Sequence, residues 1–167
     1  MRDGRGRVGD HIRRGLSMAG GAMLACAAVT PSIAGVFDPF VAAWHGSGTV
    51  QAFDGQTAAV RCKVDVTTEV GERASQELRC ASTGYVIVVN ASMRLEEDAV
   101  VGSWSNDRGK SGGLKGTVSA DSVDVMLVGE DVDARMLSVL DACKLTVTIE
   151  GKLGKISHLQ VDLDKGC

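Results

Sequence analysis

The stretch 58–82 constrains the fold most, because it fixes a pairing between two segments as well as their local structure. Apolar residues alternate with polar ones over 60–66 and again over 77–81, a pattern typical of strands with one buried face. The segment between them is largely polar and centred on Gly71, a residue that can adopt positive φ. The sequence therefore predicts a β-hairpin here.

The two cysteines of this stretch agree with its apolar face. Folding the chain about Gly71 brings Cys62 opposite Cys80 and Val64 opposite Leu78 on the same side of the hairpin. Cross-strand neighbours lie about 4.5 to 5.5 Å apart, which allows a disulfide. We therefore predict a Cys62–Cys80 disulfide in a small, exported, antiparallel protein.

The first 34 residues are typical of a secretory signal peptide. Five arginines precede a mildly apolar stretch that ends in Ser32-Ile33-Ala34, a small-x-small cleavage signal. The apolar stretch is too short and too rich in glycine and serine for a membrane span, which needs about 20 apolar residues. Arg13-Arg14 leaves the twin-arginine route open beside the general one, and lipidation at Cys26 is a secondary alternative to cleavage after Ala34.

Removal of the leader makes the protein acidic. Residues 1–34 contain five basic and two acidic residues, so the formal charge moves from −3 to −6. An acidic surface with scattered basic residues argues against nucleic-acid binding. The remaining chain suits a lead-in at 35–48 and one all-β domain at 49–167, with no stable membrane span.

The mature chain begins with one expected helical turn. Asp38-Pro39 provides an N-cap and a proline suited to the first helical position, which favours a turn over 40–44. Phe40 and Trp44 would then share one face and plug the end of a sheet or barrel. The first strand is expected at 49–53. The strand over 85–95 is apolar on both faces in its first half, so something must cover its outer side.

The second half of the chain continues the strand pattern. Residues 132–140 fit a strand or a helix capped by Asp131, and the strand is preferred because its neighbours are strands. A turn at 152–154 places Val147 opposite Leu159 in the closing hairpin. Cys143 would then pair with Cys167 only by elimination, and the tail would have to turn back at Gly166.

Short strands at nearly regular spacing, with polar turns and no long helix, indicate an all-β domain. We predict an antiparallel up-and-down barrel, or a strongly curled sheet, of eight to ten short strands. A two-sheet β-sandwich is the alternative. Barrel closure is favoured because it removes exposed strand edges.

Several motifs resemble a group of small exported alphaproteobacterial proteins with no assigned activity. They are Trp44-His45-Gly46-Ser47-Gly48, the cysteine pair of the central hairpin, Gly102-Ser103-Trp104 and the closing strand pair. This resemblance implies a barrel and a periplasmic address. Ser82, Gly84 and Tyr85 beside a disulfide give a fainter likeness to periplasmic lysozyme inhibitors.

No motif predicts catalysis or a cofactor. Gly109-Lys110-Ser111 lacks the earlier glycine and the following helix of a phosphate-binding loop. His45 and Ser103 could be combined with an aspartate as a hydrolase set, but their spacing gives no support. The acidic segment 96–98 is typical of a solvated turn and not of a metal site. Glu130, Asp131 and Asp133 lack the glycine and the distal carboxylate of a calcium loop, and the cysteines lack the C-x-x-C pair of a zinc site.

We therefore expect a non-enzymatic exported protein, periplasmic or secreted, with two alternative modes of action. In the first, a barrel lined by small aliphatic side chains binds a small apolar ligand. In the second, a solid barrel acts through its surface on an envelope protein or as an inhibitor, with Val86 and Val88 as an apolar contact patch.

Overall fold

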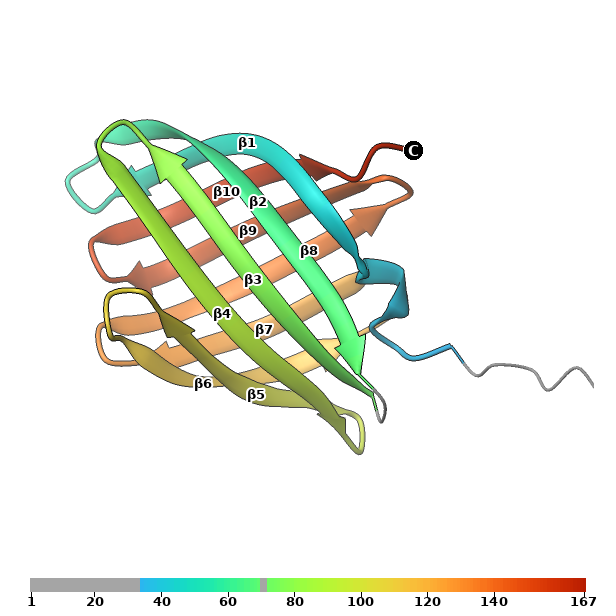
Figure 1. Cartoon of the computed structure of the whole chain (residues 1–167). Coiled ribbons are helices and arrows are strands. Elements are labelled where there is room, and N and C mark those ends of the chain that lie inside the picture. Colours follow the sequence, from blue (N-terminus) through green and yellow to red (C-terminus); the bar gives the residue numbers. More distant parts are fainter. Residues whose placement is uncertain (1–33, 70–71) are drawn as a thin grey trace, which may run out of the picture. The chain divides into compact units, whose positions relative to one another are not determined.

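The computed structural model describes residues 34–69 and 72–167, so the predicted leader and the centre of the Gly71 turn lie outside the described residues. A short 3-10 helix is followed by ten strands (Figure 1). In chain order the elements are η1 (Asp38–Phe40), β1 (Ala42–Ala52), β2 (Thr57–Glu69), β3 (Arg73–Ser82), β4 (Tyr85–Glu96), β5 (Ala99–Asn106), β6 (Ser111–Val118), β7 (Ser122–Gly129), β8 (Val132–Asp141), β9 (Lys144–Leu153) and β10 (Ile156–Asp164).

The strands form one closed antiparallel barrel. Each strand pairs with its neighbours in sequence, and β1 pairs with β10 to close the wall. The predicted all-β barrel is confirmed, and the sandwich alternative is not adopted. The segment 132–141 is strand β8, as preferred from its neighbours. Within the described residues no helix has the length and apolar character to cross a membrane.

Branched aliphatic side chains fill the middle of the barrel. Alternate residues of every strand point inward, and the most deeply buried of them are mainly valine and leucine. Such a core was expected from a chain in which only 4% of residues are aromatic. These buried side chains include Val64, Val100, Val125, Val161 and Leu163.

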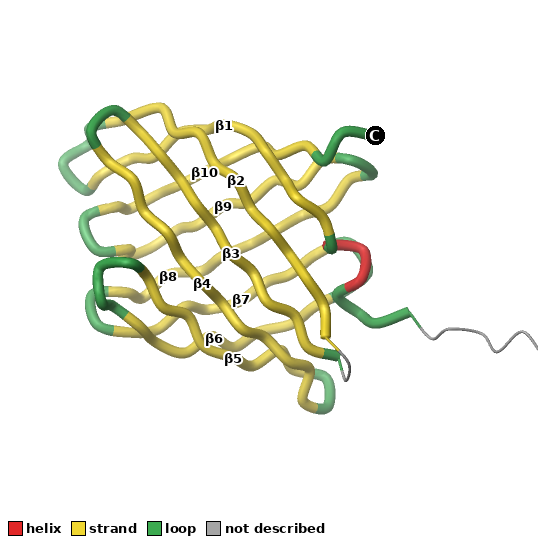
Figure 2. The backbone as a smooth tube through the Cα atoms, viewed as in Figure 1, coloured by secondary structure: helices red, strands yellow, loops and turns green. Residues whose placement is uncertain are grey.

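Three aromatic residues near the N-terminus plug one end of the barrel. Phe37 and Phe40 are buried, Trp44 is completely buried, and the Trp44 indole Nε1 donates a hydrogen bond of 2.9 Å to the Phe40 carbonyl oxygen. Figure 2 shows the short helix at the end of the barrel that also holds the C-terminus. The predicted plug is therefore present.

The predicted helical turn over 40–44 is wrong in position, and the first strand, expected at 49–53, begins earlier than predicted. The helix covers Asp38–Phe40, and β1 already begins at Ala42. Extended backbone from this point pairs with β2 on one side and, from His45 on, with β10 on the other. These two ladders satisfy more main-chain groups than one helical turn would.

Glycines lie on the two strands, β1 and β6, where the wall bends between the strands at the front of Figure 1 (β1 to β4) and those behind them (β7 to β10). Gly46 and Gly48 lie on β1, and Gly112 and Gly116 lie on β6. A methyl group at any of these positions would overlap a main-chain carbonyl oxygen of the adjacent strand, β10 or β7. Only glycine permits this approach, and glycine kinks are a known means of curving a sheet into a barrel.

The central hairpin has the predicted register. Cys62 lies opposite Cys80 and Val64 lies opposite Leu78. The two cysteines form a disulfide with a Cα–Cα distance of 4.1 Å, and their exposed fractions are 5% and 4%. This bridge therefore lies inside the barrel.

The closing hairpin differs from its predicted register by two residues. Val147 lies opposite Val161 instead of Leu159. Leu153 pairs with Ile156, so the turn lies at 154–155 and would by itself shift the register by three residues. An irregularity between Ile156 and His158 brings the shift back to two. The shift preserves the apolar face because side chains alternate with a period of two.

This shifted register explains how the second disulfide forms. The Lys165 amide donates a hydrogen bond of 3.2 Å to the Cys143 carbonyl oxygen, so Cys143 lies beside the tail. Gly166 takes the left-handed conformation expected of it, with φ of +68°, and Cys143 bonds to Cys167 at a Cα–Cα distance of 5.9 Å. The Lys165 ammonium then lies 5.0 Å from the centre of the Trp44 ring, over the aromatic plug.

Candidate functional site

Short polar side chains cover the outer face of five consecutive strands, β2 to β6. They form two rows of cross-strand neighbours that run perpendicular to the strands. The first row is Asp65, Glu77, Asn90, Ser105 and Ser111, and the second row is Thr67, Ser75, Ser92 and Ser103. Because neighbouring strands are about 4.8 Å apart, the first row is about 19 Å long.

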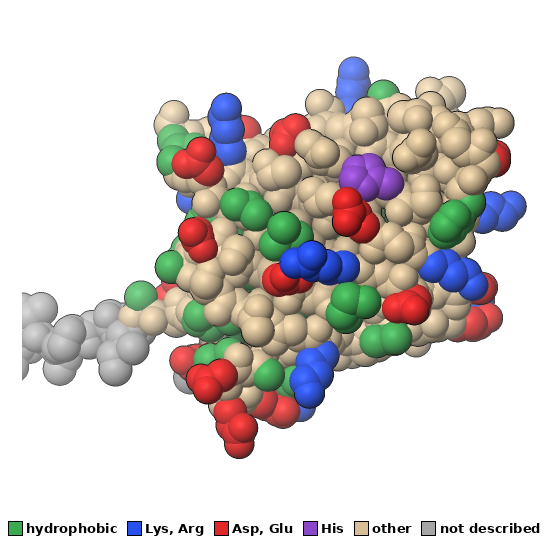
Figure 3. Space-filling view, turned by 180° about the vertical axis from the view of Figure 1, so that it is seen from behind, with side chains coloured by type: hydrophobic (Ala, Val, Ile, Leu, Met, Phe, Trp, Pro, Cys, Tyr) green, Lys and Arg blue, Asp and Glu red, His purple; other side chains and the backbone are tan. Residues whose placement is uncertain are grey.

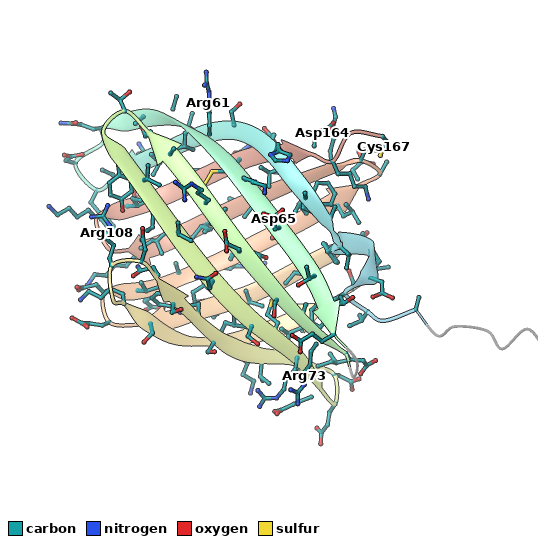
Figure 4. The ribbon with its side chains drawn as sticks, viewed as in Figure 1. Arg61, Asp65, Arg73, Arg108, Asp164 and Cys167 are labelled. Atoms are coloured by element: carbon teal, nitrogen blue, oxygen red, sulfur yellow. A yellow bond between two sulfur atoms is a disulfide. The ribbon has the colours of Figure 1, made fainter. Side chains whose placement is uncertain are left out.

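The two rows border a hollow in the outer surface, which we call the polar trough. Its volume is about 680 Å³, and both rows line it. Four residues at inward positions, which alternate with the outward side chains, also line the trough: Gln76, Ala91, Trp104 and Gly112. Their main chain therefore forms the floor. Figure 4 shows Asp65 near the middle of this face.

A second, smaller hollow continues the trough toward the plugged end of the barrel. Its volume is about 270 Å³, and we call it the arginine hollow. Ser92 and Ser103 line both hollows and lie directly opposite each other on β4 and β5. The arginine hollow is lined by Arg73, Ser92, Met93, Arg94, Gly102 and Ser103.

Charges of like sign lie opposite each other around the trough. Asp65 faces Glu77 within the first row, and Lys63 faces Arg79 on the side away from the arginine hollow. The Lys63 ammonium forms an ion pair of 2.8 Å with Asp65 along β2. The β2 and β3 side of the trough therefore carries both positive and negative side chains, whereas the arginine hollow is lined by two arginines, Arg73 and Arg94.

The structure does not assemble the hydrolase set considered from the sequence. Ser103 lies on the outer face of β5, in the trough, and His45 lies on the outer face of β1. Four strand spacings separate them, about 19 Å along the wall. A nucleophile and its base must lie within hydrogen-bonding reach, so these two residues do not form a catalytic pair.

Two of the acidic residues in 130–133, Glu130 and Asp131, are engaged in ion pairs. The Lys110 ammonium lies 2.5 Å from the Glu130 carboxylate, and Lys152 lies 3.2 Å from Asp131. Hydrogen bonding to Glu130 raises the pKa of the Lys110 ammonium. In the described part of the chain no three histidine, cysteine or acidic side chains gather as a metal site would require. These ion pairs join the turns after β5 and β7 to the end of β9.

The turn after β5 contacts the main chain of the expected apolar patch on β4. The Arg108 guanidinium donates a hydrogen bond of 3.1 Å to the Val86 carbonyl oxygen and lies 4.9 Å from the centre of the Tyr85 ring. The Asp107 amide donates to the Val88 carbonyl oxygen at 3.0 Å. These hydrogen bonds reach main-chain carbonyl oxygens, and the side chains of Tyr85 and Val86 remain exposed at 43% and 38%.

The opposite outer face mixes apolar and charged side chains (Figure 3). Arg135 on β8 forms two hydrogen bonds, of 2.8 and 2.5 Å, with the carboxylate of Asp124 on β7. These bonds lower the pKa of the Asp124 carboxyl and raise that of the Arg135 guanidinium. Met126, Val128 and Val139 are exposed around this pair.

The protein is a closed ten-stranded antiparallel barrel with a polar hollow on its outer wall. The sequence matches no protein-family model and no curated protein. Two solved structures share the fold at 12% sequence identity. The protein Rv2717c from M. tuberculosis has a TM-score of 0.65, with 81% of this chain and all of that chain covered. The S-type phycobiliprotein lyase CPES from Guillardia theta has a TM-score of 0.56, with 78% and 90% covered.

Sequence reasoning missed the trough. Each of its serines is an ordinary residue for the outer face of a strand, and no pair of them forms a motif. The available signal was that β3 to β6 carry serine and asparagine at outward positions where lysine and glutamate are commoner. Only the registers of five strands together bring these residues side by side.

Proposed function

We propose that this protein is an exported, non-enzymatic binding protein that holds a polyhydroxylated ligand, such as an oligosaccharide, in the polar trough. The observation that carries this proposal is the composition of the trough walls. Hydroxyl, amide and carboxylate groups line a hollow of about 680 Å³. These groups donate and accept hydrogen bonds, as the hydroxyls of a sugar chain do.

The shape of the trough also suits a chain. It crosses five strands on one side of the barrel, so several sugar rings in a row would lie along it. The wall beneath it is rigid, because main-chain ladders join all five strands. A rigid site loses little conformational freedom on binding, which favours affinity.

Export is part of this proposal and rests on the leader and on the two disulfides. Disulfides persist in oxidising compartments such as the periplasm. We expect the mature protein to begin near Gly35. The intact mass of the exported product tests this start, and a species that begins at Cys26 with a lipid adduct would refute it.

A pair of leucines in the trough tests the proposed function. Ser92→Leu/Ser103→Leu places two larger apolar groups opposite each other at the junction of the hollows. Ser47→Leu/Thr49→Leu, on the exposed outer face of β1, is the matched control. Binding of a panel of neutral and acidic oligosaccharides is measured by isothermal titration calorimetry. We expect the parent and the control to bind and the trough variant to lose binding.

Two results would overturn the proposed function. One is that no oligosaccharide binds the parent at millimolar concentration. The other is that the trough variant binds as well as the parent, which would place the ligand elsewhere. Amide hydrogen exchange followed by NMR, or near-ultraviolet circular dichroism, shows whether each variant retains the packed barrel.

Binding of a small apolar ligand inside the barrel is the second candidate function. It is favoured by partly buried apolar side chains at the end of the barrel that carries the turn after β1. Val50, Ile87 and Leu153 pack against the core near this end and are only partly buried. An apolar molecule that entered between the turns would contact them. Displacement of a fluorescent apolar probe, compared between the parent and Ile87→Asn, tests this candidate.

A further inference from the structure

Two arginines lie directly opposite each other in the arginine hollow. Arg73 on β3 is the cross-strand neighbour of Arg94 on β4. Like charges in this position repel and destabilise a strand pair. A guanidinium does not lose its proton in proteins, so the repulsion persists at every pH that the fold survives. Without a partner of opposite charge, the arginine pair therefore lowers the stability of the fold.

Other charges compensate the arginines only in part. Arg94 donates from Nε and Nη2 to the Glu96 carboxylate, at 2.8 and 2.5 Å. Arg73 takes part in none of the ion pairs within the described residues, although Glu69 lies opposite it on β2. Figure 4 shows Arg73 near the end of the front face, away from Asp65. One guanidinium of the pair therefore keeps its donors for a further partner.

The surroundings of the pair suit an anionic group. Both arginines line the hollow of about 270 Å³ together with the hydroxyl-bearing Ser92 and Ser103. Gly102 and Met93, which alternate with the outward side chains, contribute their main chain to this hollow. A guanidinium presents its donors as a planar fork that matches the two oxygens of a carboxylate or the oxygens of a sulfate.

We propose that the arginine hollow binds an anionic group carried by the polyhydroxylated ligand, which makes that ligand an acidic polysaccharide. This inference rests on the proposed function of the trough. Ser92 and Ser103 join the two hollows, so one chain can occupy both. The carboxylate and the sulfate are the two forms that share this chemistry.

The charge pattern also fixes where the anionic group lies. Glu77 and Asp65 belong to the first row, and Glu77 is four residues from Arg73 along β3. Four residues of a strand span about 13 Å. An anion is repelled at the row of Glu77 and attracted at Arg73. The acidic sugar therefore binds at the arginine end, and neutral sugars occupy the rest of the trough.

The test compares three oligosaccharides of equal length: a neutral glucose oligomer, an oligogalacturonate and a sulfated oligosaccharide. Their affinities for the full mature protein are measured by calorimetry. We expect at least one acidic probe to bind about tenfold or more tightly than the neutral one, the ratio that corresponds to about 1.4 kcal/mol. Which acidic probe binds more tightly distinguishes the carboxylate from the sulfate.

Arginine variants locate the effect. Arg73→Gln and Arg94→Gln should each reduce the preference for the acidic probe to less than about threefold while neutral binding is kept. The matched control is Arg79→Gln, on the outer face of β3 and outside both hollows. It removes the same charge and should leave the preference intact.

The outcomes separate this inference from the proposed function. Equal binding of neutral and acidic probes by the parent overturns the inference and leaves the proposed function standing. An equal effect of all three arginine variants also overturns it, because the attraction would then be general. Failure of every probe to bind the parent overturns the proposed function and the inference with it.

Discussion

Removal of the Cys62–Cys80 disulfide should destabilise the barrel strongly. The bridge joins residues separated by 18 positions in the sequence. In the chain-entropy model, closure of a loop of this length removes unfolded-state entropy worth about 3 kcal/mol at 25 °C. Both cysteines are buried in the core, so alanine at these positions also leaves unfilled space.

The expected change in melting temperature follows from the size of the domain. The described barrel spans residues 34 to 167. With an unfolding entropy of about 2.1 cal/mol/K per residue, about 3 kcal/mol corresponds to a decrease of roughly 11 °C. Circular dichroism melting of the Cys62→Ala/Cys80→Ala variant under oxidising conditions measures this decrease.

The comparison variant is Cys143→Ala/Cys167→Ala, which opens a bridge over 24 positions. The same model assigns it a similar entropy. We expect a smaller loss, because three tail residues after β10 regain freedom in the folded state when this bridge is absent. If the Cys62→Ala/Cys80→Ala variant melts within about 2 °C of the parent, a change well below 1 kcal/mol, the reasoning from the hairpin register is refuted.

Three further predictions concern other parts of the barrel. Gly48→Ala should cost more than about 2 kcal/mol in urea unfolding because its methyl overlaps main chain, whereas Gly113→Ala, which meets only an ordinary contact, should be nearly neutral. Asp124→Asn should lower stability by less than about 1 kcal/mol at pH 7. The pKa of this carboxyl is lowered by its arginine partner, so the stabilisation is present above the ordinary aspartate pKa of about 3.9 and is lost as the pH falls through the folded-state value. In native protein, dithiothreitol should reduce Cys143–Cys167 before the buried bridge, as peptide mapping of alkylated cysteines would show; simultaneous reduction would contradict the assigned burial.

The central hairpin was predictable because two independent signals specify one register. A shift of one residue would turn the apolar face outward, and a shift of two would keep that face but separate Cys62 from Cys80. The closing hairpin has only the first kind of signal. Its apolar alternation is compatible with both Leu159 and Val161 opposite Val147, and the turn after Leu153 together with the irregularity after Ile156 decides between them.

The wrong prediction of a helical turn over 40–44, followed by a late first strand, has a different cause. Local preference over 40–44 favours a helix, but pairing of β1 with β2 from Ala42 on, and with β10 from His45 on, outweighs that preference. Gly46 and Gly48 were assigned to a lead-in, since glycine is usually rare inside strands. Their role depends on the approach of β10, whose residues are distant in sequence.

The candidate site was less predictable than the fold. Ser92 and Ser103 come from strands joined by a short turn, but the trough needs β2 and β6 as well. The rows that border the trough come together only through the register of the whole set of strands. No local pattern in the sequence carries that information.

Closure of the wall by β1 and β10 has a consequence for biogenesis. The Ser157 hydroxyl donates to the Gln51 carbonyl oxygen across 106 positions of sequence. A chain that emerges N-terminus first therefore leaves β1 as an open edge until almost the whole polypeptide has followed. Such edges recruit other chains, and contacts this distant form slowly. The waiting edge contains Gly46-Ser47-Gly48-Thr49, a segment with little β-propensity and no apolar run. The glycines that shape the finished wall thus also make the unfinished chain a poor template for aggregation.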